Sequence, residues 1–202
     1  MTKIFAHRGA SAYAPENTME AFHLAAKQGA DGIELDVHVT KDGEVVVTHD
    51  EKIDRVSNGS GFVKDMTLRE LKRLSFHNHM ESYVGAGIPT LREVLEFVKT
   101  TTMAVNIELK TGLYWYPNIE EKTVALVHEL GMQDRIIYSS FNHHSIAKLK
   151  EIDSAAETAW LFSDVILNVE QYAKANGVEG LHPAVYHMYM SDFMKRWNCL
   201  LY

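Results

Sequence analysis

Cysteine is almost absent from this sequence, and long apolar runs are missing. The 202 residues hold one cysteine, Cys199, and a single thiol cannot form an internal disulfide. No run of about 18 apolar residues indicates a membrane span. The N-terminal residues before His7 contain no long apolar segment of the signal-peptide type. We therefore expect a soluble, cytoplasmic protein with no stable insertion into a membrane.

Positive charge is also in short supply. Lysine and arginine together number 20 against 27 aspartates and glutamates, which leaves a formal net charge of −7. Proteins that bind nucleic acids rely on clustered cations to displace counterions, so we expect no nucleic-acid partner. Because a negative surface also repels phosphate, any phosphate site must be built locally.

The hydrophobic pattern alternates short β-branched runs with longer amphipathic stretches, as in a parallel sheet with crossover helices. The predicted strands are 3–6, 32–39, 103–110, 135–140, 157–162 and 179–182. The predicted helices begin after Pro15 and at Thr90, then cover 119–130, 143–152, 167–175 and 191–197. This order predicts an α/β fold of the TIM-barrel type in one domain, residues 1–202.

An insertion interrupts the barrel pattern after the second strand. Asp42-Gly43 reads as a turn into another strand, 44–50, where a simple barrel has a helix. A glycine-rich loop, 57–61, and a short helix, 67–74, follow, and the turn at Gly85–Gly87 ends the segment. We expect an inserted subdomain at about 42–87.

The pattern accounts for about six of the eight strands of a TIM barrel, which typically needs about 250 residues. The last residues, 197–202, do not read as a strand followed by a helix. We therefore expect a barrel that is truncated at its C-terminus. An open six-stranded sheet is the alternative.

Carboxylates lie near the ends of two predicted strands. Glu34 and Asp36 are two residues apart and share one face, and Glu108 has the corresponding place on the third barrel strand. Their sequence neighbours are apolar, and a buried carboxylate is costly unless it is paired or bound to a metal. Three carboxylates favour a hard cation, so we predict Mg²⁺, Ca²⁺ or Mn²⁺ at this site.

Two histidines and two cations follow the strands that surround this predicted site. His7 and His49 each end a strand, and next to a cation one imidazole can accept a proton while the other donates one. Arg8 and Lys110 are placed to bind phosphate oxygens. For a lone histidine an ordinary polar position is the usual alternative, and most of the 11 histidines fit it.

Glu16 and Asn17 stand at the start of the first predicted helix. Their side chains can orient Arg8 or a metal-bound water through hydrogen bonds. Plain capping of the helix explains them equally well.

Six motifs together resemble the glycerophosphodiester phosphodiesterase family. They are His7-Arg8-Gly9, Pro15-Glu16-Asn17-Thr18, Glu34-Leu35-Asp36-Val37, Thr40-Lys41-Asp42-Gly43, His49-Asp50 and Asn106-Ile107-Glu108-Leu109-Lys110. The resemblance implies a TIM barrel with a small insertion that hydrolyses glycerophosphodiesters to an alcohol and sn-glycerol 3-phosphate. It also implies the assignment of the site residues: a divalent cation on Glu34, Asp36 and Glu108, acid–base catalysis by His7 and His49, and phosphate binding by Arg8 and Lys110.

Two alternative functions remain open at this stage. A lysophospholipase D on the same fold would need an apolar platform at the mouth, for which the candidates in the insertion are Phe62, Met66, Phe76, Met80 and Tyr83. These residues equally suit a small core of the insertion itself. The other alternative is an inactive, truncated family member that acts only as a binding protein.

Overall fold

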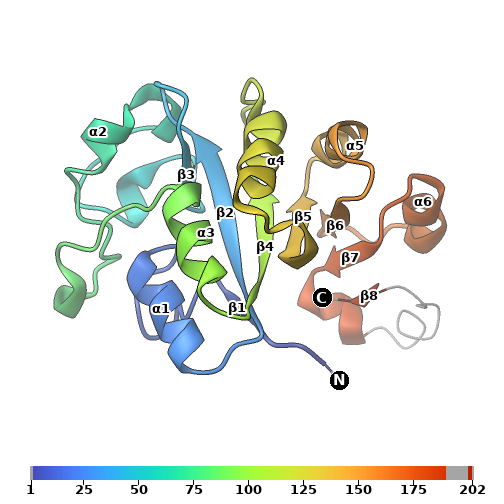
Figure 1. The fold of residues 1–202 in the computed structure, drawn as a ribbon, viewed down its shortest axis with the longest axis horizontal. Helices are drawn as coiled ribbons and strands as arrows, with labels where there is room; N and C mark the ends of the chain where they lie inside the picture. Colours follow the sequence, from blue (N-terminus) through green and yellow to red (C-terminus); the bar gives the residue numbers. More distant parts are fainter. Residues whose placement is uncertain (1, 190–199, 202) are drawn as a thin grey trace.

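One curved parallel sheet with helices along its outer side dominates the computed structural model, which describes residues 2–189 and 200–201 (Figure 1). Parallel strands follow one another in chain order along the sheet. Their bounds are β1 Phe5–His7, β2 Gly32–Val39, β4 Ala104–Leu109, β5 Ile136–Ser140, β6 Glu157–Phe162, β7 Gly180–Pro183 and β8 Leu200–Leu201. Sequential order is that of a barrel wall, so the sheet is an incomplete barrel rather than a doubly wound sheet.

Helices connect these strands, and each helix packs one face against the sheet. Their bounds are α1 Met19–Lys27, α3 Leu91–Lys99, α4 Ile119–Leu130, α5 His143–Ile152 and α6 Val169–Ala175. Helix α3 begins with a capping box, in which Thr90 and Glu93 each accept a hydrogen bond from the other's backbone N–H. The main hydrophobic core lies between these helices and the outward-facing residues of the strands, such as Leu35 and Ile107.

The segment predicted as an insertion, about 42–87 and called the inserted segment below, has a hydrophobic cluster of its own. It contains β3 Val45–Val47, which pairs antiparallel with β2, and the short helix α2 Leu68–Leu71. Alternation along β3 divides its side chains, because Val46 packs in the insertion while Val45 and Val47 join the main core. In Figure 1 helix α2 and the loops of this segment lie beside β3, on the left of the view.

Two predictions concern the C-terminal end of the chain. Residues 197–202 do not read as a strand followed by a helix, and within them the structure has one short strand, Leu200–Leu201, which pairs parallel with β7. Two leucines carry no periodic pattern of their own, so only pairing with β7 defines this strand. The predicted helix 191–197 lies outside the described residues.

The remaining predicted elements are present with ends shifted by a few residues. The first strand begins at Phe5 instead of Lys3, and the predicted helix 67–74 shortens to α2. In the part of the chain that the structure describes, no helix combines the length and the apolar character that crossing a bilayer requires.

Burial of α3 gives a stability prediction. Leu95 is fully buried, so Leu95→Ala should lower the free energy of unfolding by about 2–5 kcal/mol. The matched substitution Leu167→Ala removes the same atoms from a side chain that is 82% exposed, and it should change this free energy by less than about 0.5 kcal/mol. Urea unfolding followed by circular dichroism measures both. Equal losses would contradict the core assigned to α3.

Candidate active site

Two neighbouring parallel strands carry the acidic residues. In the register of β2 and β4, Asp36 lies directly beside Glu108, and Glu34 lies beside Asn106. Side chains of Glu34, Asp36 and Glu108 are all buried, and each offers an oxygen within 4.8 Å of the others. Alternation along β2 sends the flanking Leu35 into the outer core, so the carboxylates face the concave side of the sheet.

The three carboxylates of the acidic cluster repel one another. Burial, followed by the charge of Asp36, raises the pKa of Glu108 to about 7. Burial and the charges of Asp36 and Glu108 raise the pKa of Glu34 well above its usual value. Carboxylates this close ionise together only when positive charge compensates them.

Two cationic side chains supply part of that compensation. Lys110 Nζ lies 2.9 Å from Glu108 Oε1 and 3.7 Å from Asp36 Oδ1. Burial alone lowers the pKa of Lys110, but the two carboxylates outweigh it and raise the pKa. Arg8 has a left-handed backbone with φ 57°, its N–H donates to Glu34 Oε2 at 2.9 Å, and its Nε lies 3.6 Å from Asp36 Oδ2.

Both predicted histidines lie at the same site. His7 Nε2 is 3.8 Å from Glu34 Oε2, although the side chain of His7 is 69% exposed. Partial burial and then the charge of Arg8 lower the pKa of His7, which favours a neutral ring at pH 7. His49 approaches from the end of β3, with Nε2 3.3 Å from Lys110 Nζ.

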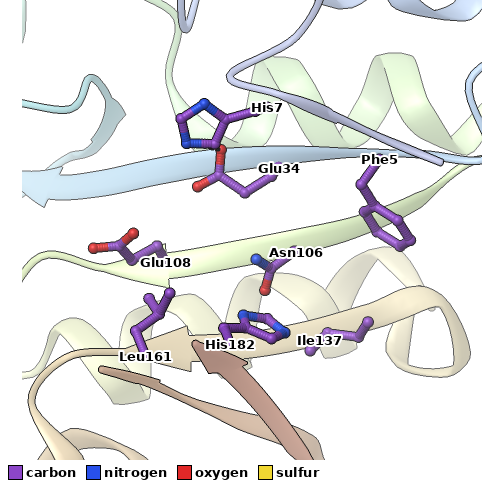
Figure 2. Close-up of a pocket in the computed structure, with 8 residues that line it drawn as sticks. All are labelled: Phe5, His7, Glu34, Asn106, Glu108, Ile137, Leu161 and His182. Atoms are coloured by element: carbon purple, nitrogen blue, oxygen red, sulfur yellow. Dashed lines mark ion pairs between the residues drawn. The ribbon is translucent and has the colours of Figure 1, made fainter. Parts of the chain in front are cut away.

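The hollow beside these residues is the concave side of the incomplete barrel. It is lined by Phe5, His7, Glu34, Asn106, Glu108, Ile137, Leu161 and His182. Figure 2 shows Glu108 toward the C-terminal end of β4, Glu34 next to His7, and Phe5 at the other end of the hollow. Active sites of TIM barrels lie at the C-terminal face, where this acidic cluster is found.

Glu16 and Asn17 contact the site and do not cap the helix. Glu16 Oε1 accepts a hydrogen bond from Arg8 Nη1 at 3.0 Å, and Asn17 Nδ2 donates to Asp36 Oδ2 at 2.9 Å. The N-cap of α1 is Thr18, whose hydroxyl accepts from the N–H of Ala21. The structure therefore brings these residues to Arg8 and Asp36, and their role in orienting these groups stays a prediction.

Sequence reasoning overlooked several residues around His49. The buried ring of His38 contacts Tyr116 Oη at 2.9 Å through Nδ1 and the backbone oxygen of His49 at 3.1 Å through Nε2. Arg55, in the 3₁₀ turn Ile53–Arg55, reaches Asp50 and Glu16. Alternation along β2 indicates the inward direction of His38, but no local signal indicates its contact with Tyr116.

Two polar residues to which the sequence analysis gives no role, Asn106 and His182, also line the hollow. Asn106 precedes Glu108 by two residues and shares its face, and its Oδ1 is buried without a hydrogen bond from the described residues. His182 lies on β7, and burial lowers its pKa to about 4. Asn106 belongs to a motif that the sequence made visible, whereas His182 follows no recognisable pattern.

The donor set fits the predicted cation. All three candidate ligands are carboxylates, which suit Mg²⁺, Ca²⁺ or Mn²⁺ better than softer metals. Asp36 Oδ1 is buried and accepts no hydrogen bond from the described residues, so it is available as a ligand. Raised pKa values at Glu34 and Glu108 indicate too little positive charge for three carboxylates.

The site combines an acidic cluster, two histidines and two cationic side chains at the C-terminal face of a barrel wall. Enzymes that cleave phosphate esters with the help of a divalent cation have sites of this class. The profile of the Glycerophosphoryl diester phosphodiesterase family matches residues 7–197. The chain belongs to this family, so the predicted family and enzyme class are confirmed.

Similar proteins span slightly more than this chain. A glycerophosphodiester phosphodiesterase of Bacillus altitudinis is 46% identical over 187 residues, which is 92% of this chain and 76% of that protein. The crystal structure of a glycerophosphodiester phosphodiesterase from Agrobacterium tumefaciens is 34% identical, with a TM-score of 0.83 over 96% of this chain and 81% of that one.

A third similar protein was solved with a bound product. A phosphodiesterase from Oleispira antarctica, in complex with the product sn-glycerol-3-phosphate, is 29% identical to this chain. The TM-score is 0.84, and the match covers 100% of this chain and 84% of that one. These matches confirm the predicted fold class, an α/β barrel of the TIM type that is incomplete in this chain.

Cation binding should stabilise the protein measurably. A cation that binds only the folded state at about 100 times its Kd adds about 2.7 kcal/mol to the free energy of unfolding. We expect Mg²⁺, Ca²⁺ or Mn²⁺ to raise the Tm, and Glu108→Gln to abolish this rise. Glu129→Gln, at a side chain that is 59% exposed, is the matched control. A full rise in the Glu108→Gln variant would rule out this ligand set.

The charge of Glu108 also gives a pH dependence. Its pKa is about 7 in the folded protein and near 4.5 when unfolded, so its ionisation destabilises the fold progressively as the pH rises between these values. In EDTA, the stability of Glu108→Gln relative to the unchanged protein should therefore rise from pH 5 to pH 7 and level off above. Urea unfolding at each pH measures this difference. A difference that is constant with pH would contradict the raised pKa.

Proposed function

We propose that this protein hydrolyses glycerophosphodiesters to an alcohol and sn-glycerol 3-phosphate, with a divalent cation held by Glu34, Asp36 and Glu108. The observation that carries the proposal is the buried carboxylate cluster with a histidine on either side. When bound, the cation supplies Lewis-acid stabilisation of charge on the phosphoryl oxygens.

Arg8 and Lys110 hold the phosphodiester in this proposal. Both side chains are mostly buried, with 19% and 14% exposed, and lie within 4 Å of Asp36. Charge-assisted hydrogen bonds are stronger in such partly desolvated places than at the surface. The two cations provide the local positive field that a chain of net charge −7 otherwise lacks.

His7 and His49 move the protons. The displacement at phosphorus requires one group to accept a proton from the attacking oxygen and another to donate one to the leaving alkoxide. Each ring has a nitrogen near the carboxylate cluster, His7 beside Glu34 and His49 beside Lys110. Either ring suits either task.

The substrate class rests on the relatives. The similar Bacillus altitudinis protein is a glycerophosphodiester phosphodiesterase, and the Oleispira antarctica phosphodiesterase holds sn-glycerol-3-phosphate as its product. Since the chain covers 76% or more of each of these relatives, the same product is the natural proposal here.

A lysophospholipase D is less well supported. Of the residues offered as an apolar platform, Phe76 is buried in the core of the inserted segment and Met66 packs against that core. Phe62 packs edge-on against Tyr114. An inactive binding protein, the other alternative, predicts no turnover at all, so the same assay separates it from the proposed enzyme.

Activity should require both the cation and its ligands. With Mg²⁺ or Ca²⁺ we expect release of sn-glycerol 3-phosphate from glycerophosphocholine or glycerophosphoethanolamine, and EDTA should stop it. Glu34→Ala removes a proposed ligand and should lower kcat/KM at least about a hundredfold. An enzyme-coupled assay of glycerol 3-phosphate measures the release.

The control for this experiment is Glu96→Ala, at a side chain that is 55% exposed on α3. It should retain full activity. Activity of the unchanged protein that survives EDTA, or of Glu34→Ala at full rate, would refute the metal-dependent reaction.

A further inference from the structure

Arg55 joins two carboxylates that come from distant parts of the chain. Its Nε donates to Asp50 Oδ2 at 2.7 Å. Its Nη1 and Nη2 donate to Glu16 Oε2 and Oε1 at 2.9 and 2.7 Å, in a bidentate pair that spans 39 residues of sequence. The planar guanidinium group therefore holds the carboxylates of Asp50 and Glu16 at the same time.

The first of these acids, Asp50, contacts the ring of His49. Asp50 Oδ1 lies 2.6 Å from His49 Nδ1, and Lys110 Nζ lies 3.3 Å from His49 Nε2. An ammonium group only donates, so Nε2 accepts and the proton of the neutral ring resides on Nδ1, where it donates to Asp50. Both contacts demand the same tautomer.

Asp50 uses its two oxygens for two partners. With Oδ2 engaged by Arg55, Oδ1 is left to His49. Burial raises the pKa of Asp50, but the hydrogen bonds from Arg55 and His49 outweigh it and bring the pKa to about 2. Asp50 is therefore an anion, and a pure acceptor, throughout the physiological pH range.

The second acid, Glu16, positions Arg8. Glu16 Oε1 accepts from Arg8 Nη1 at 3.0 Å and from Arg55 Nη2 at 2.7 Å. Arg8 Nε in turn lies 3.6 Å from Asp36 Oδ2, at the carboxylate cluster. Hydrogen bonds from Arg55 and the charge of Arg8 outweigh burial and lower the pKa of Glu16, so this acid is also ionised.

We propose that Arg55 is a positioning residue, which holds Asp50 on His49 and Glu16 on Arg8 and so aligns a proton-transfer group with a phosphate-binding group. The inference rests on the proposed roles of His49 and Arg8. A merely structural ion pair is the competing explanation, since Arg55 also ties the inserted segment to the loop before α1. With a side chain that is 44% exposed, such a pair contributes little to stability because solvent screens it.

The tautomer of His49 tests this proposal without any substrate. Ring ¹⁵N NMR, with the signals of His49 identified by their loss in His49→Gln, should report the Nδ1–H form in the unchanged protein. Arg55→Ala should increase the Nε2–H form, because Asp50 is no longer held. Arg73→Ala, at another exposed arginine of the inserted segment, is the matched control and should leave the tautomer unchanged. An unchanged tautomer in folded Arg55→Ala would overturn the proposal.

Enzyme kinetics provide a second test of the proposed role of Arg55. Arg55→Ala should lower kcat/KM about ten- to a hundredfold with little change in Tm, and Arg55→Lys should restore part of the loss. In a double-mutant cycle with Asp50→Asn the two effects should be strongly non-additive. Additive effects, or a loss of activity only in proportion to a lower Tm, would overturn the proposal. If the unchanged protein hydrolyses no glycerophosphodiester, the proposed function fails while the NMR experiment still decides the role of Arg55.

Discussion

Repulsion among three buried carboxylates is the constraint on which the rest of the site depends. Glu34, Asp36 and Glu108 lie within 4.8 Å of one another because β2 and β4 are adjacent parallel strands in matching register. Such a cluster is unfavourable by itself, as the raised pKa values of Glu34 and Glu108 indicate. Arg8 and Lys110 supply complementary positive charge, and the proposed divalent cation would supply more.

Around this cluster the side chains form an alternating network of charge. Lys110 connects Glu108 to His49, and Arg55 connects Asp50 to Glu16. His49 is held from two sides, at its backbone oxygen by His38 and at its ring by Asp50. A network in which each partner is held by the next restricts side-chain motion more than separate ion pairs do. These contacts therefore orient the ring of His49.

Much of the fold and of the site could be predicted from local pattern. Alternation along residues 32–39 places Glu34 and Asp36 on one face, and this requires nothing beyond the geometry of a strand. The contacts of Arg55 with Glu16 and of His38 with Tyr116 could not be predicted, because they join residues 39 and 78 positions apart. The strand Leu200–Leu201 was missed for a related reason, since pairing with β7 defines it.

Sequence alone was sufficient to predict the α/β order, the candidate ligands and the family, because periodicity and short motifs are local properties of a chain. The contacts of Glu16 and Asn17 with Arg8 and Asp36, and the capping of the helix by Thr18, became visible only in the folded chain. The fold also sets the register of β2 and β4, and with it the distances among the carboxylates. Such distances depend on how separate strands pack, and local sequence does not specify that packing.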